Sequence, residues 1–597
     1  MSFTGYLHLG NSAFEFMPQC LQEAGDSRHG DGWGMAGDSI AATEGAVCAF
    51  HGVLTNRRDL CQEAGLPEDT SPQQLILHAC LNGQTDFRAL RGAFCFAVID
   101  TANRKLLLVR DQLGCDFLYH AALPNGTHVF STSLNNLRRL PGVSSQISLQ
   151  ALFDYLSLGY VPSPLTIFRG IEKIRPGHRL AITENSCNDA IYWKPDFNQK
   201  QKINYHDAVA EAWKLFDIAV KRCLDAQPNS DVLLSGGIDS NLVLALASTS
   251  DGFGGHAFTV GFDEAKYDER ALSKLSAEKY NVPHELMQIP PSAWDELPSA
   301  QRLNGEPYGD SSIIPTICAM RLAKQHGSGA VMTGSGGDEV FGGYRRYQAM
   351  AVRHRWRWLP NFIIRPTTSL ILKILGEQED ARARFATLRR FAAFWRMPPL
   401  PGYATFQEIF SEDLRRQICQ EWTKNATTPY LDGWAKLSDE MNVNDFVEKF
   451  NAIDVMSYLP DDGCRKEALA SEVTGVADIC PLLDLDIVEF GLSLPRKLRV
   501  TCGERKRVLR GIGAYLLPPE LLKQTKRGFG MPVSSWFRTE CKDRLLDLAS
   551  SVKSWDRYGW FKPEAIEQLC NDHLDGRRDN GARLWILLCL KTWLEQL

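Results

Sequence analysis

The chain has 597 residues and a net charge of −5, from 66 Lys and Arg against 71 Asp and Glu. Hydrophobic residues make up 44% and charged residues 23%, which excludes a mostly disordered, collagenous or coiled-coil chain. There is no basic excess to drive nonspecific binding to nucleic acid, and no apolar run approaches the roughly 20 residues of a membrane helix. The N-terminus also lacks a secretory signal. We therefore expect a cytoplasmic protein with neither a nucleic-acid nor a membrane partner.

The pattern along the chain predicts two domains. Residues 1–195 contain short apolar or alternating runs, and two of them, 93–100 and 105–110, predict a hairpin. A polar stretch at 196–205 has the composition of a linker. In 206–597, helical periods alternate with buried-strand runs, which predicts βαβ units and a parallel sheet covered on both faces.

A basic segment at 353–396 has three tryptophans, Trp356, Trp358 and Trp395, between its arginines. One interpretation is a surface for nucleic acid or an acidic peptide. We favour the simpler one, a pair of amphipathic helices with a solvated basic face.

A Gly-rich loop lies between a predicted buried strand at 231–234 and a predicted helix at 241–247. It reads Ser235-Gly236-Gly237-Ile238-Asp239-Ser240. The glycines let backbone N–H groups approach an anion, and the helix N-terminus adds positive potential. Asp239 would suit a Mg²⁺ bridging phosphate oxygens. A simple capped turn is the alternative, but the strand–loop–helix context favours a pyrophosphate site. The Walker pattern is absent, which argues against ordinary γ-phosphoryl transfer.

A second Gly-rich turn follows another apolar run. It begins Thr333-Gly334-Ser335-Gly336-Gly337-Asp338-Glu339 and continues to Tyr344 and Tyr347. Asp338 would be a second oxygen ligand for Mg²⁺, and Glu339 could orient an amine or accept its proton.

Together these motifs resemble the asparagine synthetase family over essentially the whole chain. The resemblance implies an α/β and α+β multidomain protein, with an N-terminal Ntn-hydrolase-like αββα sandwich and a C-terminal PP-loop parallel sheet with helical additions. It also implies ATP and Mg²⁺ as cofactors. The implied reaction adenylates a carboxylate, releases pyrophosphate and forms an amide when an amine attacks.

The resemblance also assigns residues. Lys526, in the run Lys526-Arg527-Gly528-Phe529-Gly530-Met531-Pro532, falls on the family's essential lysine, where its charge would stabilise the transition state. Glu339 and Tyr344 join it as catalytic residues, and Asp239 and Asp338 as metal ligands. The implied nucleotide-binding residues are Ser235, Gly236, Gly237, Asp239, Ser240, Val260, Asp268, Thr333 and Gly334.

The glutaminase half departs from the family pattern. Active members place a cysteine after the initial Met, and this chain has Ser2, whose hydroxyl is harder to activate than a thiol. The family's Asn-Gly oxyanion pair is His51-Gly52 here. We therefore expect a structural domain with a degenerate site at Ser2, His51 and Gly52.

The acceptor site departs as well. The family's Asp-Arg and Glu/Arg pairs align with 466–469 and 477–484, where this chain has mostly small or apolar residues. Their loss argues against aspartate as the substrate and predicts an apolar pocket.

An intact ATP half with a silent ammonia source predicts an amide-forming ligase that takes its amine elsewhere. The expected substrates are a peptide or small-molecule carboxylate and an amine. We favour macrolactam formation in a lasso-peptide precursor, with a leader-peptide protease as candidate partner. The alternatives are an asparagine synthetase-type amidotransferase using glutamine or free ammonia, a β-lactam-synthetase-like cyclase, and a catalytically idle scaffold.

Overall fold

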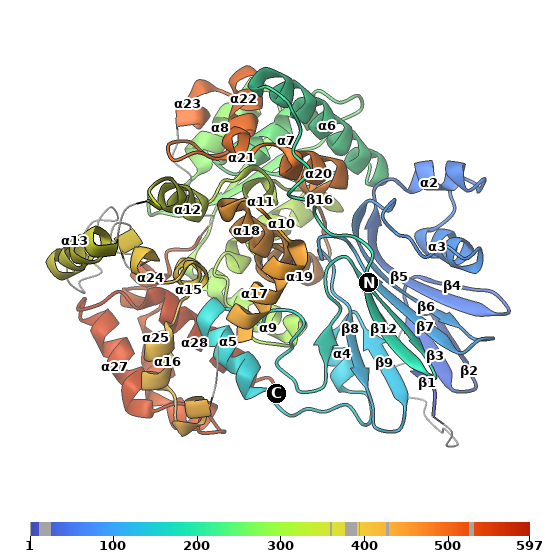
Figure 1. Ribbon diagram of the computed structural model, residues 1–597, viewed down its shortest axis with the longest axis horizontal. Coiled ribbons are helices and arrows are strands. Elements are labelled where there is room, and N and C mark those ends of the chain that lie inside the picture. Colours follow the sequence, from blue (N-terminus) through green and yellow to red (C-terminus); the bar gives the residue numbers. More distant parts are fainter. Residues whose placement is uncertain are drawn as a thin grey trace.

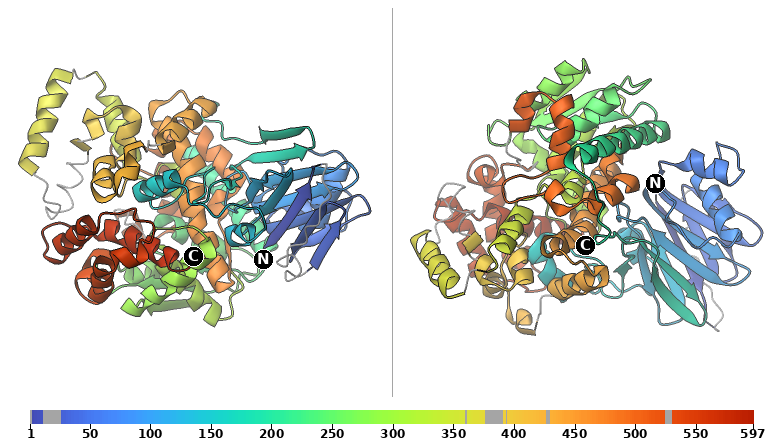
Figure 2. Two further views of the ribbon diagram at one scale, coloured as in Figure 1. Left: turned by 90° about the horizontal axis from the view of Figure 1, so that it is seen from below. Right: turned by 45° about the horizontal axis from the view of Figure 1, so that its top comes forward.

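The structure is a computed structural model. It describes residues 2–10, 26–358, 361–375, 391–392, 394–425, 429–523 and 530–597. The chain forms an antiparallel β-sandwich followed by a larger part built on a parallel sheet, and the two lie side by side in all three views (Figures 1 and 2).

The sandwich consists of two six-stranded antiparallel sheets. The first has the order β10 (Glu172–Lys173), β8 (Tyr119–Ala122), β9 (Thr127–Ser131), β1 (Phe3–His8), β3 (Trp33–Gly37), β2 (Asp26–Gly30). The second has the order β12 (Ser186–Ile191), β11 (His178–Thr183), β7 (Lys105–Arg110), β6 (Gly92–Asp100), β5 (Ala46–Leu54), β4 (Ile40–Ala42). The predicted hairpin is confirmed, since β6 and β7 pair antiparallel.

Strand β6 shows why the second sheet is buried on both faces. Successive side chains of a strand point to opposite faces. Cys95, Ala97 and Ile99 pack into the layer between the sheets, while Phe94 and Phe96 pack outward beneath two helices. These helices are α2 (Arg57–Glu63) and α3 (Pro72–Leu81).

The first sheet turns its outer face toward the C-terminal part. Tyr6, Tyr119 and Val129 belong to the same apolar cluster as the helices of that part. The sandwich helices α4 (Leu134–Arg138) and α5 (Leu149–Leu158) contribute to this cluster. The two parts of the chain therefore share one continuous core.

Polar groups pin the same interface. The Lys173 ammonium lies 2.8 Å from the Glu306 carboxylate, and both residues are buried. The Ser163 backbone N–H donates to Asp461 at 2.7 Å. Because these partners come from opposite sides of the interface, they fix the orientation of the sandwich as well as its contact.

The C-terminal sheet is parallel, as predicted, and has five strands within the described residues. Their order is β15 (His284–Gln288), β14 (Ala257–Gly261), β13 (Asp231–Leu233), β16 (Ala330–Met332), β17 (Ala477–Ile479). Helices α6 (Tyr205–Ala226), α7 (Ile238–Ser248) and α22 (Arg507–Leu516) pack with Val232 in one cluster. Helix α10 (Ile313–Gln325) packs against β14 within the other.

The strand order creates a switch point between β13 and β16. From β13 the chain proceeds to β14 and β15 on one side, and later to β16 and β17 on the other. Loops at the carboxyl ends of two such strands diverge and leave a crevice, where open α/β sheets bind ligands. Both Gly-rich motifs follow these two strands directly.

Most of the remaining described chain is helical. Its helices include α9 (Leu297–Asn304), α11 (Gly337–Phe341), α12 (Arg345–Arg355), α13 (Asn361–Leu375), α17 (Pro429–Met441), α18 (Phe446–Ile453), α19 (Arg465–Thr474), α20 (Leu485–Ser493), α21 (Arg496–Arg499), α24 (Val533–Arg538), α25 (Lys542–Ser550), α27 (Pro563–Leu574) and α28 (Gly581–Leu594). Within the described ranges, no helix has both the length and the apolarity to cross a membrane.

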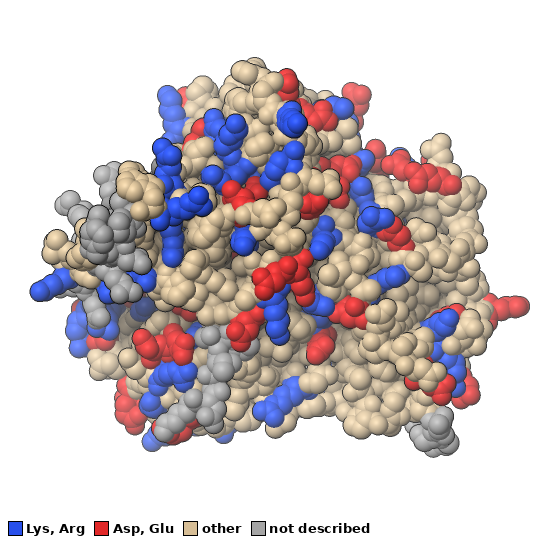
Figure 3. Space-filling view, viewed as in Figure 1, with Lys and Arg blue, Asp and Glu red and all other residues tan. Residues whose placement is uncertain are grey.

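The basic segment is mainly helical where it is described. Helices α12 and α13 cover much of its first part, with a turn at 356–358, and residues 359–360, 376–390 and 393 lie outside the described residues. Trp356 and Trp358 are 45% and 67% exposed. Lys and Arg side chains gather over α12, α21 and α22 on the face shown in Figure 3.

An aromatic cluster joins α28 to the sheet side of the core. The centroid of the Trp585 ring lies 5.1 Å from that of the Trp294 ring, and the Trp585 indole N–H donates to the Gly309 carbonyl at 2.8 Å.

Replacing Trp585 by Ala should lower the free energy of unfolding by about 3–5 kcal/mol, because it leaves a large cavity. Denaturant unfolding measures this change. The control Trp358→Ala, at an exposed tryptophan, should stay within about 0.5 kcal/mol of wild type, and equal effects would contradict the packing described.

Candidate active site

A cavity of about 500 Å³ opens at the carboxyl ends of β13 and β16. Its walls come from both Gly-rich motifs, α19 and the segment before α22. The lining includes Ser235, Gly236, Gly237, Asp239, Ser240, Val260, Glu269, Asp310, Thr333, Gly334, Asp338, Glu339, Tyr344, Asp462, Lys466, Glu467, Arg505, Lys506 and Arg510. The structure thus brings together residues that lie almost 300 positions apart in the sequence.

Hydrogen bonds within the first Gly-rich loop and to the start of α7 fix the conformation of this loop. The Ser235 and Ser240 hydroxyls lie 2.9 Å apart, and the Gly237 N–H donates to the Ser235 hydroxyl at 3.1 Å. The Asn241 amide donates to the Ser235 and Gly237 carbonyls at 2.7 and 2.6 Å. With Gly237 as its N-cap, α7 points its N-terminus into the cavity. This arrangement suits a phosphate group.

The second loop crosses the first at backbone distance. A Cβ on Gly334 would lie 2.5 Å from the Ser240 nitrogen, a contact that side chains do not make. Glycine is therefore required at this position, because the two phosphate-side loops touch there.

Two carboxylates meet across this crossing. The Lys506 ammonium forms ion pairs with Asp239 and with Asp338, the latter at 2.7 Å. Lys506 is only 8% exposed and has a positive φ of 51°. Among the described residues, Asp239 Oδ1 is buried without a hydrogen-bond partner. Two hard oxygen donors, one of them unsatisfied, fit a Mg²⁺ ion, so Asp239 and Asp338 would hold it.

Glu339 and Tyr344 form the next pair along the second motif. The Tyr344 hydroxyl donates to Glu339 Oε1 at 2.6 Å. Burial raises the pKa of Glu339, which is 3% exposed. The Arg346 guanidinium lies 3.8 Å from the centroid of the Tyr344 ring. A buried carboxylate with a raised pKa that reaches the cavity suits proton transfer.

The opposite end of the cavity is charged, and the expectation of an apolar acceptor pocket is wrong. Asp310, Asp462, Lys466 and Glu467 line it. Burial and the neighbouring Asp310 raise the pKa of Asp462 to about 8. Lys466 and Glu467 belong to the stretch 466–469 itself, so the small residues beside them, Ala468 and Leu469, did not predict the lining of the cavity.

A further group lies behind this wall. The Ser335 hydroxyl donates to Glu467, and the Cys480 thiol lies 3.3 Å from Glu467 Oε2 and 3.2 Å from Asp478 Oδ2. One ligand atom from each of Glu467, Asp478 and Cys480 lies within 4.8 Å of the others. Burial and Glu467 raise the pKa of Asp478 well above its usual range.

The other expected residues divide into three groups. Val260, Thr333 and Gly334 line the cavity. Asp268 does not line it and instead pairs with Arg270 at 2.8 Å. Lys526 lies outside the described residues.

Sequence analysis missed Lys506 and Glu269. The Gly236 N–H donates to Glu269 Oε2 at 3.0 Å. Glu269 directly follows Asp268, which was expected to bind nucleotide, and this position could have indicated that Glu269 belongs to the site. Lys506 had no comparable signal, because it stands among several basic residues before α22.

The degenerate glutaminase residues lie in the sandwich. The Ser2 backbone N–H donates to Asp38 Oδ2 at 3.0 Å, and His51 Nε2 lies 3.5 Å from Asp116 Oδ1. Gly52 has a φ of +105°, which only glycine adopts readily. Loss of glutaminase activity stays a prediction.

Comparison with known proteins agrees with this geometry. The family model for asparagine synthase matches residues 211–595. The chain belongs to the asparagine synthase family. A second model, for the glutamine amidotransferase domain, matches 42–193. The protein is therefore an enzyme of the ligase type that forms amides with ATP.

Relatives match over most of their length. A putative glutamine-hydrolyzing asparagine synthetase of Mycobacterium bovis is 26% identical over 92% of this chain and 84% of its own. Glutamine-hydrolyzing asparagine synthetase 1 of Bacillus subtilis is 24% identical over 91% and 84%. Amidase chyE of Penicillium rubens is 29% identical over 80% and 76%.

Replacing Lys506 by Met should lower the rate of pyrophosphate release by about 100-fold, because a cation positioned at the phosphates is lost. It also leaves the buried Asp239 and Asp338 carboxylates facing each other. The rate is measured with ATP, Mg²⁺ and an acceptor acid. Lys497→Met, at an exposed lysine of α21, is the control, and similar rates in the two variants would contradict this role.

Proposed function

We propose that the protein adenylates a carboxylate with ATP and Mg²⁺ and passes the acyl group to ammonia or an amine that it does not obtain from glutamine. The observation that carries this proposal is the meeting of Asp239, Asp338 and Lys506 beside the first Gly-rich loop. Carboxylates able to hold Mg²⁺ and a cation beside them suit the phosphates of ATP, and the lack of a Walker pattern supports attack at the α-phosphorus rather than the γ-phosphorus.

The first step joins the acceptor to the nucleotide. A carboxylate oxygen attacks the α-phosphorus, and the bond to pyrophosphate breaks. The Ser235 and Ser240 hydroxyls and the N-terminus of α7 line the part of the cavity where the leaving pyrophosphate would lie. Mg²⁺ would supply neutralising charge on the phosphate oxygens. Lys506, on the same side of the cavity, stabilises the charge that develops there.

The second step forms the amide. The amine attacks the acyl carbon, AMP leaves, and the amine gives up a proton. Glu339 is placed to accept this proton, because its carboxylate reaches the cavity and burial raises its pKa. Tyr344 holds the carboxylate by its hydrogen bond.

The amine source distinguishes this proposal from that of a glutamine-dependent enzyme. Two relatives carry glutamine-hydrolyzing in their names, whereas this chain has Ser2 and His51 where the resemblance expects the nucleophilic cysteine and the asparagine of the oxyanion pair. An asparagine synthetase-type amidation with free ammonia or an amine is the function we favour. The expected apolar pocket was the main reason to favour a lasso-peptide macrolactam, and the charged lining removes it.

With ATP, Mg²⁺ and a panel of small carboxylic acids, ammonium or hydroxylamine should drive release of pyrophosphate and AMP, and glutamine should not. Asp239→Asn should abolish the release, since a phosphate-side ligand is lost. The matched control Asp251→Asn, at an exposed position, should keep it. Glutamate formation from glutamine that Ser2→Ala removes would contradict the proposal.

The rate should fall as the pH drops. The midpoint of this fall should lie above the pKa of an ordinary glutamate, because burial raises the pKa of Glu339. The carboxylate accepts a proton only when ionised, so protonation at low pH removes the base. A profile of kcat against pH measures this midpoint. Glu339→Gln should lower kcat and remove the fall; an unchanged midpoint would assign the fall to another group.

A further inference from the structure

Helix α11 carries Asp338 and Glu339 but has only five residues. A helix this short does not hold its own conformation, and its last carbonyls lack partners within the helix. The Asp338 carbonyl accepts from the Gly343 N–H at 2.8 Å, so the groups that satisfy the next two carbonyls help to determine where Glu339 stands.

Two buried side chains supply these partners. The Asn451 amide donates to the Glu339 carbonyl at 2.7 Å, and the Arg499 guanidinium donates to the Val340 carbonyl at 3.1 Å. Arg499 also donates to Asn451 Oδ1 at 2.7 Å. This contact fixes the orientation of the amide, so that its NH₂ group faces Glu339. Asn451 and Arg499 are 3% and 2% exposed.

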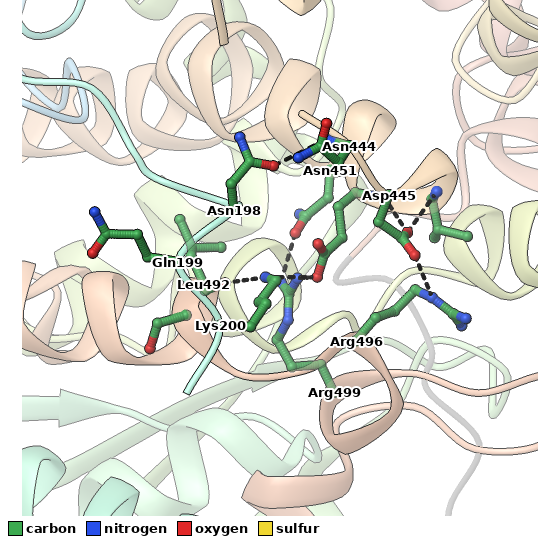
Figure 4. Close-up of polar contacts among 12 residues, drawn as sticks. Asn198, Gln199, Lys200, Asn444, Asp445, Asn451, Leu492, Arg496 and Arg499 are labelled. Carbon is green, nitrogen blue, oxygen red and sulfur yellow. Dashed lines mark hydrogen bonds and ion pairs between the residues drawn. The ribbon is translucent and has the colours of Figure 1, made fainter. Parts of the chain in front are cut away.

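The charge of Arg499 is balanced by Glu448, which is also 2% exposed and pairs with it. Glu448 accepts a second cation, Lys200, at 2.9 Å. Figure 4 shows these contacts between the helices and the loop before α6, which holds Asn198 and Lys200.

The segment before α6 is itself anchored. Lys200 also donates to the Leu492 carbonyl at 2.6 Å. The Asn444 N–H donates to Asn198 Oδ1 at 3.0 Å, and the Asn198 amide donates to the Asn442 carbonyl at 2.8 Å. The segment that joins the sandwich to the parallel-sheet part is thus docked against the support of α11.

We propose that Asn451 and Arg499 are positioning residues that hold Glu339 in place, and that Lys200 extends this support to the segment between the two parts of the chain. The proposal rests on the proposed function for its kinetic consequences. It makes amide formation depend on correct seating of the connecting segment, although no residue of that segment lines the cavity.

Hydrogen exchange tests the positioning without reference to activity. In the full chain, Asn451→Ala and Arg499→Lys should speed exchange of the amides at 337–343 by at least tenfold, while the fold elsewhere keeps its protection. Lys200→Met should give a smaller increase. The control Lys202→Met, at an exposed lysine of the same segment, should give none. Unchanged exchange in the Asn451 and Arg499 variants overturns the proposal, and Lys200→Met behaving as Lys202→Met overturns the part played by the segment.

Kinetics then test whether the network acts through Glu339. Asn451→Ala should lower kcat for amide formation by 10- to 100-fold and change KM for ATP less than threefold. Because its effect passes through Glu339, it should cause no further loss in a Glu339→Gln background. Arg499→Lys, which keeps the charge, should retain more activity than Arg499→Met. The proposal would be overturned if the double variant lost kcat by the product of the two factors that the single variants lose. A wild-type protein that releases no pyrophosphate would instead refute the proposed function, and hydrogen exchange would still decide the positioning.

Discussion

The ion pairs of Lys506 with Asp239 and Asp338 are the interaction on which the cavity depends. Two buried carboxylates on crossing loops would repel each other, and a cation between them lets the loops approach. The backbone contact at Gly334 is possible only at this separation. Catalytic chemistry and loop packing are therefore set by the same few atoms.

The rest of the molecule serves to hold these loops. Strands β13 and β16 bring them together at the switch point, and buried polar side chains add hydrogen bonds to the few that the short helix α11 makes itself. Both signs of charge line the cavity, where Lys466, Lys506 and two arginines stand among several carboxylates. Fixed charges of this kind orient a substrate before any bond changes.

Local patterns in the sequence carried much of this information. The strand–loop–helix motifs indicated that Ser235 and Asp338 follow the ends of buried strands, and both residues line the cavity. Asp268 pairs with Arg270 outside the cavity, since proximity in a motif does not decide where a side chain points. Lys506 and the charged wall around Glu467 depend on contacts between distant segments, and no periodicity encodes these.

The shared core between the sandwich and the parallel-sheet part has an evolutionary consequence. Tyr6, Tyr119 and Val129 are covered by helices of the other part, and the buried Lys173–Glu306 pair crosses the same boundary. Deleting the sandwich would expose the apolar side chains of the parallel-sheet part to water. It would also leave the Glu306 carboxylate without the ammonium group that pairs with it. Selection for solubility and folding therefore retains the sandwich whether or not it hydrolyses glutamine.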